Sequence, residues 1–110
     1  MKKFFITLIF SLISTVSFAG NGYCDGRPSA REVQRCYVNA VQSQNGIMNS
    51  LVEKIMASNK ITHQDKAELD KHIEDWSNRV NSTCRSDVCI YNSLVDYNRQ
   101  LNNYYIQYAK

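Results

Sequence analysis

The sequence is poor in the residues that interrupt helices. Its 110 residues include one proline and four glycines, and three of those glycines share the stretch 20–28 with the proline. Because glycine and proline mark turns and the ends of regular elements, the rest of the chain has few interruptions. No stretch alternates apolar and polar residues for long enough to suggest a strand. These absences exclude a sheet-based fold and favour an all-α protein with an irregular lead-in.

Motifs for catalysis or metal binding are also missing. The sequence has no glycine-rich phosphate loop and no serine in a nucleophile elbow. Its two histidines, His63 and His72, do not stand at metal-ligand spacing, and we expect both at the surface. Glu74 and Asp75 are neighbours, so on a helix their carboxylates point about 100° apart and form no glycosidase pair. We therefore expect no enzyme, no metal site and no cofactor.

The start of the chain has the pattern of a signal peptide. Lys2 and Lys3 precede an almost unbroken apolar run over 4–13, and residues 17–19 place small side chains where a signal peptidase cuts. We therefore predict a signal peptide over 1–19. The alternative is an uncleaved membrane anchor, which the run disfavours because a bilayer span takes about 20 apolar residues.

Residues 20–110 are then expected to form a single small domain in the periplasm, with no membrane insertion after cleavage. The chain carries 13 Lys and Arg against 10 Asp and Glu, and two of the basic residues fall in the leader. A nearly neutral domain lacks the strongly basic face that nucleic acid requires, so we expect no nucleic-acid partner. All four cysteines lie in this part of the chain, and an even number in a small exported domain predicts two disulfides.

The first helix is predicted to begin after Ser29. Ser29 and Glu32 form a capping-box pattern, in which each side chain satisfies a free backbone amide of the new helix. The helix runs to about Ser58, with one broad apolar face. Its stripe consists of Val33, Cys36, Ala40, Gln44, Ile47, Leu51 and Ile55, widened by Tyr37, Val41, Met48, Val52 and Met56.

Two further helices follow short turns. Thr62 with Asp65 three residues later is a second N-cap pattern, and that helix runs to Cys84. Ser86 or Asp87 caps the third helix, which continues towards the end of the chain. We therefore predict an all-α fold, in which a long antiparallel helical hairpin is followed by a third C-terminal helix.

The two long helices are predicted to face each other in one register. In a hairpin that turns near residue 60, positions equally far from the turn lie opposite one another. Five stripe positions match in this way: Leu51 with Leu69, Ile47 with Ile73, Gln44 with Trp76, Ala40 with Val80, and Cys36 with Cys84. We therefore prefer the disulfides Cys36–Cys84 and Cys24–Cys89. Four cysteines allow three pairings, and the sequence alone does not decide among them.

Aromatic residues supply candidates for contact with a partner. Trp76 falls on the apolar stripe, so we expect it in the core opposite Gln44, although a place in a binding surface is the alternative. Arg79 lies one turn further on, where it could pair with Asp75 or reach a partner. Tyrosines crowd the last helix and cannot all face inward, so Tyr91 and Tyr105 are candidate contact residues. The alternative is a terminal amphipathic helix with partly exposed rings.

The cysteine and tryptophan spacing resembles that of the LprI-type lysozyme-inhibitor family (DUF1311). The pattern is Cys24-x7-Glu32-x3-Cys36, then Trp76-x7-Cys84 and a nearby Cys89, and it extends over residues 23–101. The chain departs from it at Val80, where the family usually has an arginine, and matches its later tyrosine and arginine only approximately with Tyr97 and Arg99.

The resemblance implies a small helical envelope protein that binds and inhibits lysozyme. A basic lysozyme would be steered by the acidic side chains of the second helix, which are Asp65, Glu68, Asp70, Glu74 and Asp75. Of these, Asp70, Glu74 and Asp75 join Arg79 as candidate contact residues. Lys66 and Lys71 lie between these carboxylates and weaken their field. The alternative is an envelope adaptor that associates through its tyrosine-rich C-terminal helix.

Overall fold

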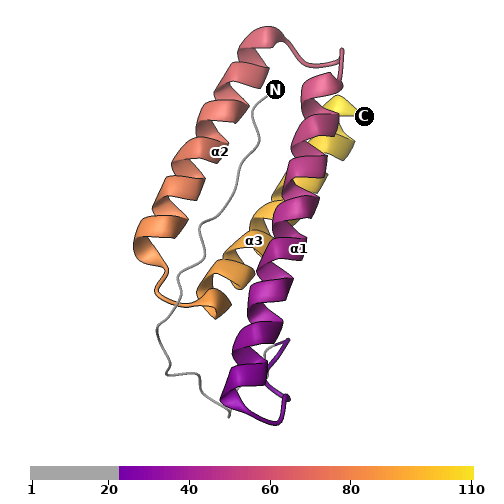
Figure 1. The fold of residues 1–110 in the computed structure, drawn as a ribbon. Helices are drawn as coiled ribbons and strands as arrows, with labels where there is room; N and C mark the ends of the chain where they lie inside the picture. The colour runs from indigo at the N-terminus through magenta and orange to yellow at the C-terminus, as the bar shows by residue number, and fades with distance from the viewer. Residues whose placement is uncertain (1–22) are drawn as a thin grey trace.

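The computed structural model describes residues 23–110, which form three α-helices and no strand (Figure 1). The helices are α1 (Ala30–Ala57), α2 (His63–Thr83) and α3 (Asp87–Tyr104), and the chain ends in a π-helical turn, η1 (Tyr105–Ala109). The all-α fold predicted from the sequence is confirmed. The predicted signal peptide lies outside the described residues.

Each helix begins at a hydroxyl residue that the sequence predicted as its cap. The side-chain oxygen accepts a hydrogen bond from the backbone N–H three positions on, in Ser29 from Glu32 (3.2 Å), Thr62 from Asp65 (3.0 Å) and Ser86 from Cys89 (3.2 Å). Such a bond satisfies one of the four backbone donors that a helix start leaves unpaired. Between the two caps predicted for α3, the structure selects Ser86.

The helix α3 is the central element. α1 and α2 run antiparallel, and α3 turns back in the direction of α1 (Figure 1). The backbone of α3 lies closest to α1, whereas the backbones of α1 and α2 stay apart along most of their length. At the far end, the Ser58 hydroxyl donates to the Ala109 carbonyl at 2.5 Å, which ties η1 to the end of α1. Both long helices therefore pack on α3.

The main core lies where the three apolar stripes meet. Its best-buried members come from all three helices: Val41, Met48, Val52 and Ile55 of α1, Ile73 of α2, and Ile90 and Leu94 of α3. A second, smaller cluster forms at the N-terminal end of α1, where Cys24, Val33 and Tyr37 are buried and Tyr91 packs against them. This cluster holds the lead-in against the start of α3.

The register predicted between the first two helices is wrong. Ile47 is 44% exposed, and Gln44 bonds to α3 instead of facing Trp76. The Asn98 amide donates to both the backbone carbonyl and the side-chain oxygen of Gln44, at 3.0 and 2.9 Å. Equal distance from the turn determines contacts only in an isolated two-helix hairpin. Here the apolar stripes of α1 and α2 both pack on α3, so α1 and α2 bury these stripes without packing on each other.

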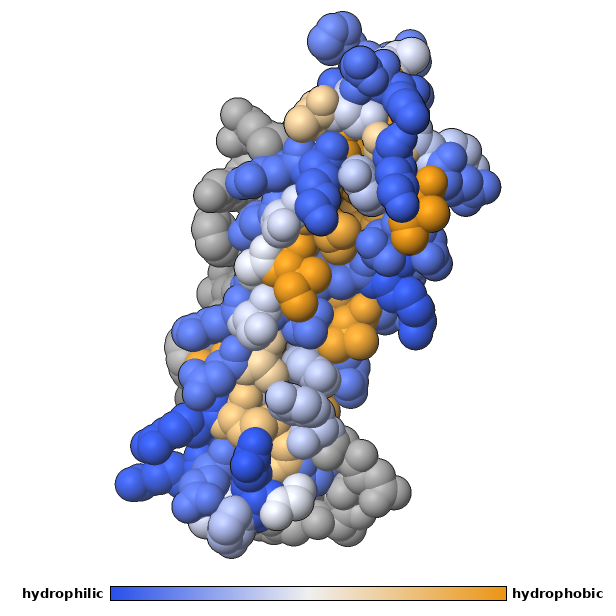
Figure 2. Space-filling model, turned by 90° about the vertical axis from the view of Figure 1, so that its right-hand side faces the viewer, coloured by the Kyte–Doolittle hydropathy of each residue, from blue (hydrophilic) through white to orange (hydrophobic). Residues whose placement is uncertain are grey.

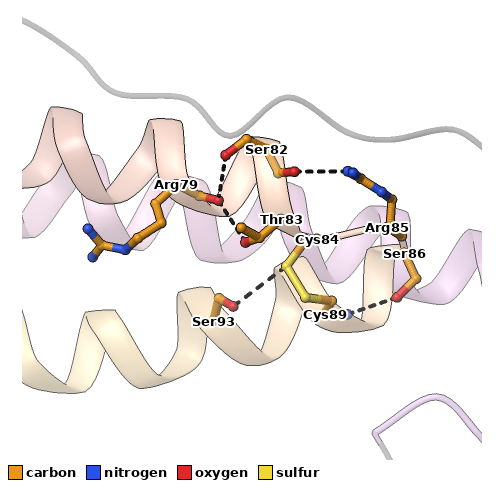
Figure 3. Close-up of a disulfide and its surroundings, with 8 residues drawn as sticks. All are labelled: Arg79, Ser82, Thr83, Cys84, Arg85, Ser86, Cys89 and Ser93. Carbon is orange, nitrogen blue, oxygen red and sulfur yellow. Dashed lines mark hydrogen bonds between the residues drawn. A yellow bond between two sulfur atoms is a disulfide. The ribbon is translucent and has the colours of Figure 1, made fainter.

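The predicted disulfide pairing is also wrong. The bonds are Cys24–Cys36 and Cys84–Cys89, with Cα–Cα distances of 5.8 and 5.5 Å that lie in the usual range for a disulfide. Both bonds are local. Cys84 ends α2 and Cys89 stands in the first turn of α3, so the short connection between the helices brings them together (Figure 3). No disulfide therefore ties α1 to α2.

Candidate partner-binding groove

An aromatic stack joins α2 to α3. The rings of Trp76 and Tyr97 lie nearly parallel with their centroids 4.2 Å apart, and both side chains are buried. On α2, one turn before Trp76, His72 stacks on the same tyrosine at 5.8 Å, and its Nδ1 lies 2.6 Å from the Tyr97 hydroxyl. Stacked rings at this spacing add to the free energy of area burial. The stack fixes how α2 sits on α3.

Burial of the stack changes the acidity of its phenol. The pKa of Tyr97 is raised to about 12, first because burial disfavours the phenolate, while the positive charge of Arg79 lowers it in part. Tyr97 therefore keeps its proton at physiological pH. Its hydroxyl oxygen lies within hydrogen-bonding distance of His72 Nδ1.

A groove of about 440 Å³ opens between α2 and α3 beside this stack. Four side chains of α2 line one wall and four of α3 the other: Asp65, Glu68, Leu69 and His72 opposite Tyr97, Gln100, Leu101 and Tyr104. Leu101 is buried and Leu69 half-buried, so the floor is apolar and the rims are polar. Such a cleft, apolar with a few polar groups at its edge, is the usual form of a binding site.

One end of the groove is acidic. Asp65 and Glu68 line the groove together with Tyr104, and the pKa of Tyr104 is raised by burial first and then by negative charges that include those of both carboxylates. The neutral side-chain amide of Gln64 donates a hydrogen bond to Glu68 at 3.3 Å. This end therefore combines a tyrosine ring with two carboxylates.

A second hollow of about 400 Å³ lies at the opposite end of the molecule, beside the Cys24–Cys36 disulfide. Tyr23 is exposed and stacks on Tyr91 with ring centroids 5.4 Å apart, and Tyr91 meets the edge of Tyr37 at 5.7 Å. The Tyr37 hydroxyl donates to Asp25 at 3.2 Å. The rim of this second hollow includes the basic side chains of Arg27 and Arg35, in contrast to the acidic end of the α2/α3 groove.

The candidate residues predicted from the sequence do not form one site. On α2, the side chains of Asp70 and Glu74 do not line the groove, and Asp75 and Arg79 are exposed beyond the Trp76 end of it. No ion pair joins Arg79 to Asp75 within residues 23–110, although Arg79 lies near enough to Tyr97 to affect its pKa.

The two candidate tyrosines of the C-terminal region lie far apart. Tyr91 belongs to the cluster around the Cys24–Cys36 disulfide. Tyr105 begins η1, where the Lys54 ammonium stands 5.8 Å from the centre of its ring. Trp76 is in the core, as expected, but it faces Tyr97 and not Gln44.

Sequence reasoning missed most of the groove. His72 is exposed, as expected, but its contact with the Tyr97 ring was not predicted. The signal was present as helical spacing, because Asp65, Glu68 and His72 recur every three or four residues on one face of α2. Tyr97, Gln100 and Tyr104 recur in the same way on α3. Which two faces meet depends on packing.

Other kinds of site have little support in the part of the chain that the structure describes. There, no group of three or more His, Cys, Asp and Glu side chains is placed to hold a metal ion. Within residues 23–110, no helix has the length and apolar character that a membrane span needs.

The chain was compared with family models, curated proteins and solved structures, and none of them matches. The resemblance to the LprI-type family therefore stays a prediction based on the cysteine and tryptophan spacing.

Proposed function

We propose that the protein is an exported, periplasmic binding protein that inhibits a lysozyme or another peptidoglycan hydrolase by covering its substrate cleft. The observation that carries this proposal is the α2/α3 groove, in which Asp65 and Glu68 stand beside Tyr104 above an apolar floor. Aromatic rings next to charge are typical of surfaces that bind proteins. The family resemblance supplies the class of partner.

Two disulfides support the exported location. Reducing compartments keep thiols reduced, so a small domain whose cysteines are all bonded belongs in an oxidising environment. The bonds stand at the start of α1 and between α2 and α3, where they hold helix ends in place. A rigid surface loses less conformational entropy on binding and therefore suits an inhibitor that acts by occlusion.

The test is lysis of purified peptidoglycan by a panel of lysozymes and bacterial wall hydrolases, with and without the purified oxidised protein. We expect dose-dependent inhibition of at least one basic enzyme, approaching completion at a stoichiometric ratio. Serum albumin at the same concentration controls for non-specific effects. Unchanged lysis across the whole panel would contradict the proposal.

An envelope adaptor that self-associates is the second candidate, and one observation favours it. Ile106 and Tyr108 are 55% and 53% exposed at the end of the chain, and Ile47 and Val95 are exposed on α1 and α3. Figure 2 shows hydrophobic side chains reaching the surface at several spots on the face beside α1. Sedimentation over a range of protein concentrations tests this candidate. A dimer that Ile106→Ser dissociates would support it, and a monomer at every concentration would contradict it.

A further inference from the structure

We infer that the α2/α3 groove is a receptor for one arginine side chain presented by a partner protein. The inference rests on the proposed function only for the existence of a partner, because the groove's own chemistry selects the side chain. It also assigns a local binding role to Glu68, which the sequence indicated only as one of five acids that steer a basic partner, and to Tyr104.

The shape of the groove suits a side chain with an apolar stem and a flat, charged head. Leu69 and Leu101 form an apolar floor between the helices, on which methylene groups can pack. The ring of Tyr104 forms a wall at the acidic end, and Tyr108 supports it with ring centroids 5.2 Å apart. A guanidinium stacks on aromatic rings while its edge donates to carboxylates.

The charges at this end call for a cation. Asp65 and Glu68 lie one turn apart on α2, and both line the groove together with Tyr104. Within the described residues neither carboxylate forms an ion pair, and the one side-chain bond to Glu68 comes from the neutral amide of Gln64. Two carboxylates without a counter-ion beside an aromatic ring are complementary to arginine.

The nearby positive groups leave this end free. His72 is engaged with the Tyr97 hydroxyl. Arg79 stands about 16 Å further along α2 than Glu68, as the helical rise dictates. Lys60 shares an adjoining hollow with Asp65 and Tyr104. The side chains of Lys60, Lys66 and Lys71 do not line the groove itself. The groove is therefore negative at one end only, which places the guanidinium between Glu68 and Tyr104.

The simplest competing explanation is that the two acids only stabilise the start of α2. Carboxylates in the first turns of a helix interact favourably with its dipole. In that case their loss would lower stability without any effect on binding. The test therefore measures binding of a small probe directly, and it does not depend on which hydrolase, if any, the protein inhibits.

The probe is N-acetyl-arginine methylamide, with the citrulline analogue as its uncharged counterpart of nearly the same shape. Each is titrated into the purified oxidised protein while amide resonances are followed by NMR. We expect saturable shifts centred on Glu68, Gln100 and Tyr104 with the arginine probe and at least about tenfold weaker binding of citrulline. Equal binding of the two probes, or no saturable shift in the groove, would overturn the inference.

Two double variants of α2 test which negative charges bind the arginine probe. Asp65→Asn with Glu68→Gln should weaken arginine binding by about tenfold or more. Asp70→Asn with Glu74→Gln changes the net charge of α2 equally but lies outside the groove, so binding should stay within about twofold. Equal losses in both pairs would indicate long-range attraction and contradict a local receptor. If the first pair fails to fold, the comparison of the two probes on the unmodified protein still decides the matter.

Failure of the lysis assay and failure of this inference are distinguishable. Arginine binding without inhibition would leave the groove as a receptor for a different partner. Inhibition without arginine binding would support the proposed function and overturn the groove as its contact site.

Discussion

At the scale of single residues, Trp76 is the buried aromatic side chain through which α2 stacks on α3. Its ring is buried and stacked on Tyr97. Trp76→Ala would remove both the burial and the stacking and would leave a cavity between two helices. We expect a loss of about 3–5 kcal/mol in the free energy of unfolding, measured by urea denaturation.

Trp76→Phe provides the matched control, because it keeps a ring in the cavity. We expect it to retain more than half of that stabilisation. If alanine and phenylalanine have equal effects, stacking at this position contributes nothing and the stack is not what holds α2.

The acidity of Tyr97 predicts how stability changes in alkali. Its folded pKa of about 12 lies above its usual value of 10.0, because the buried phenolate is disfavoured. The neutral phenol therefore contributes fully below pH 10, and this contribution is lost as the pH rises towards 12. The loss is on the order of 2–3 kcal/mol. Thermal melts across this pH range should show a steep fall in Tm.

The Tm of the Tyr97→Phe variant should fall less steeply over the same pH range. Its Tm at neutral pH should be lower than that of the unmodified protein, because the bond to His72 is lost. Tyr23→Phe, which changes an exposed ring, should follow the unmodified protein. Parallel curves of Tm against pH for all three proteins would mean that ionisation of the buried Tyr97 hydroxyl does not cause the loss of stability.

At the scale of elements, the two disulfides hold short connections. Cys24–Cys36 closes a separation of 12 residues and Cys84–Cys89 one of 5. The loop-entropy model gives each bond about 2–3 kcal/mol, slightly more for the longer loop. Serine pairs at 24/36 and at 84/89 should lower stability by these amounts, measured by urea denaturation of each double variant.

The two variants should differ in what they disturb. Loss of the first bond frees the lead-in and should abolish the stacking of Tyr23 on Tyr91. Loss of the second loosens the turn between α2 and α3 and should change the resonances of His72 and Tyr104 in the groove. If both variants leave the groove unchanged, the Cys84–Cys89 bond does not position α2.

The contrast between local and long-range features explains what the sequence could predict. Ser29, Thr62 and Ser86 were found as caps because a cap depends on residues three positions away. The disulfide pairing was missed because the hairpin register assumed that α1 packs on α2. Cys36 then had to face Cys84, whereas the lead-in returns Cys24 to Cys36.

At the scale of the whole molecule, the candidate site depends on how complete helices meet. The faces that carry Glu68 and Tyr104 can be seen in the sequence as helical spacings. Their opposition across a groove follows from the position of α2 on α3, which is fixed by the buried stack of Trp76 on Tyr97. No local pattern contains that information. The contact residues predicted from the sequence therefore lie on several faces, and the groove itself was not predicted.

The same arrangement makes the three helices unequal. The backbone of α3 lies close to α1 along their length and is tied to it by Asn98 and by the contact of Ser58 with Ala109. α2 is held mainly by the side chains of Ile73, Trp76 and Val80. Regions with few tertiary contacts open at lower free energy than the core. We therefore expect α2 to be the least protected helix in native-state hydrogen exchange.

Measured by NMR at neutral pH, amides in the middle of α2 should exchange faster than those in the middle of α1 and α3. Trp76→Phe should raise the exchange of α2 further while it leaves α1 nearly unchanged. Equal protection in all three helices would instead mean that the molecule opens only as a whole. Faster exchange confined to α2 would mean that this helix can open without unfolding α1 and α3.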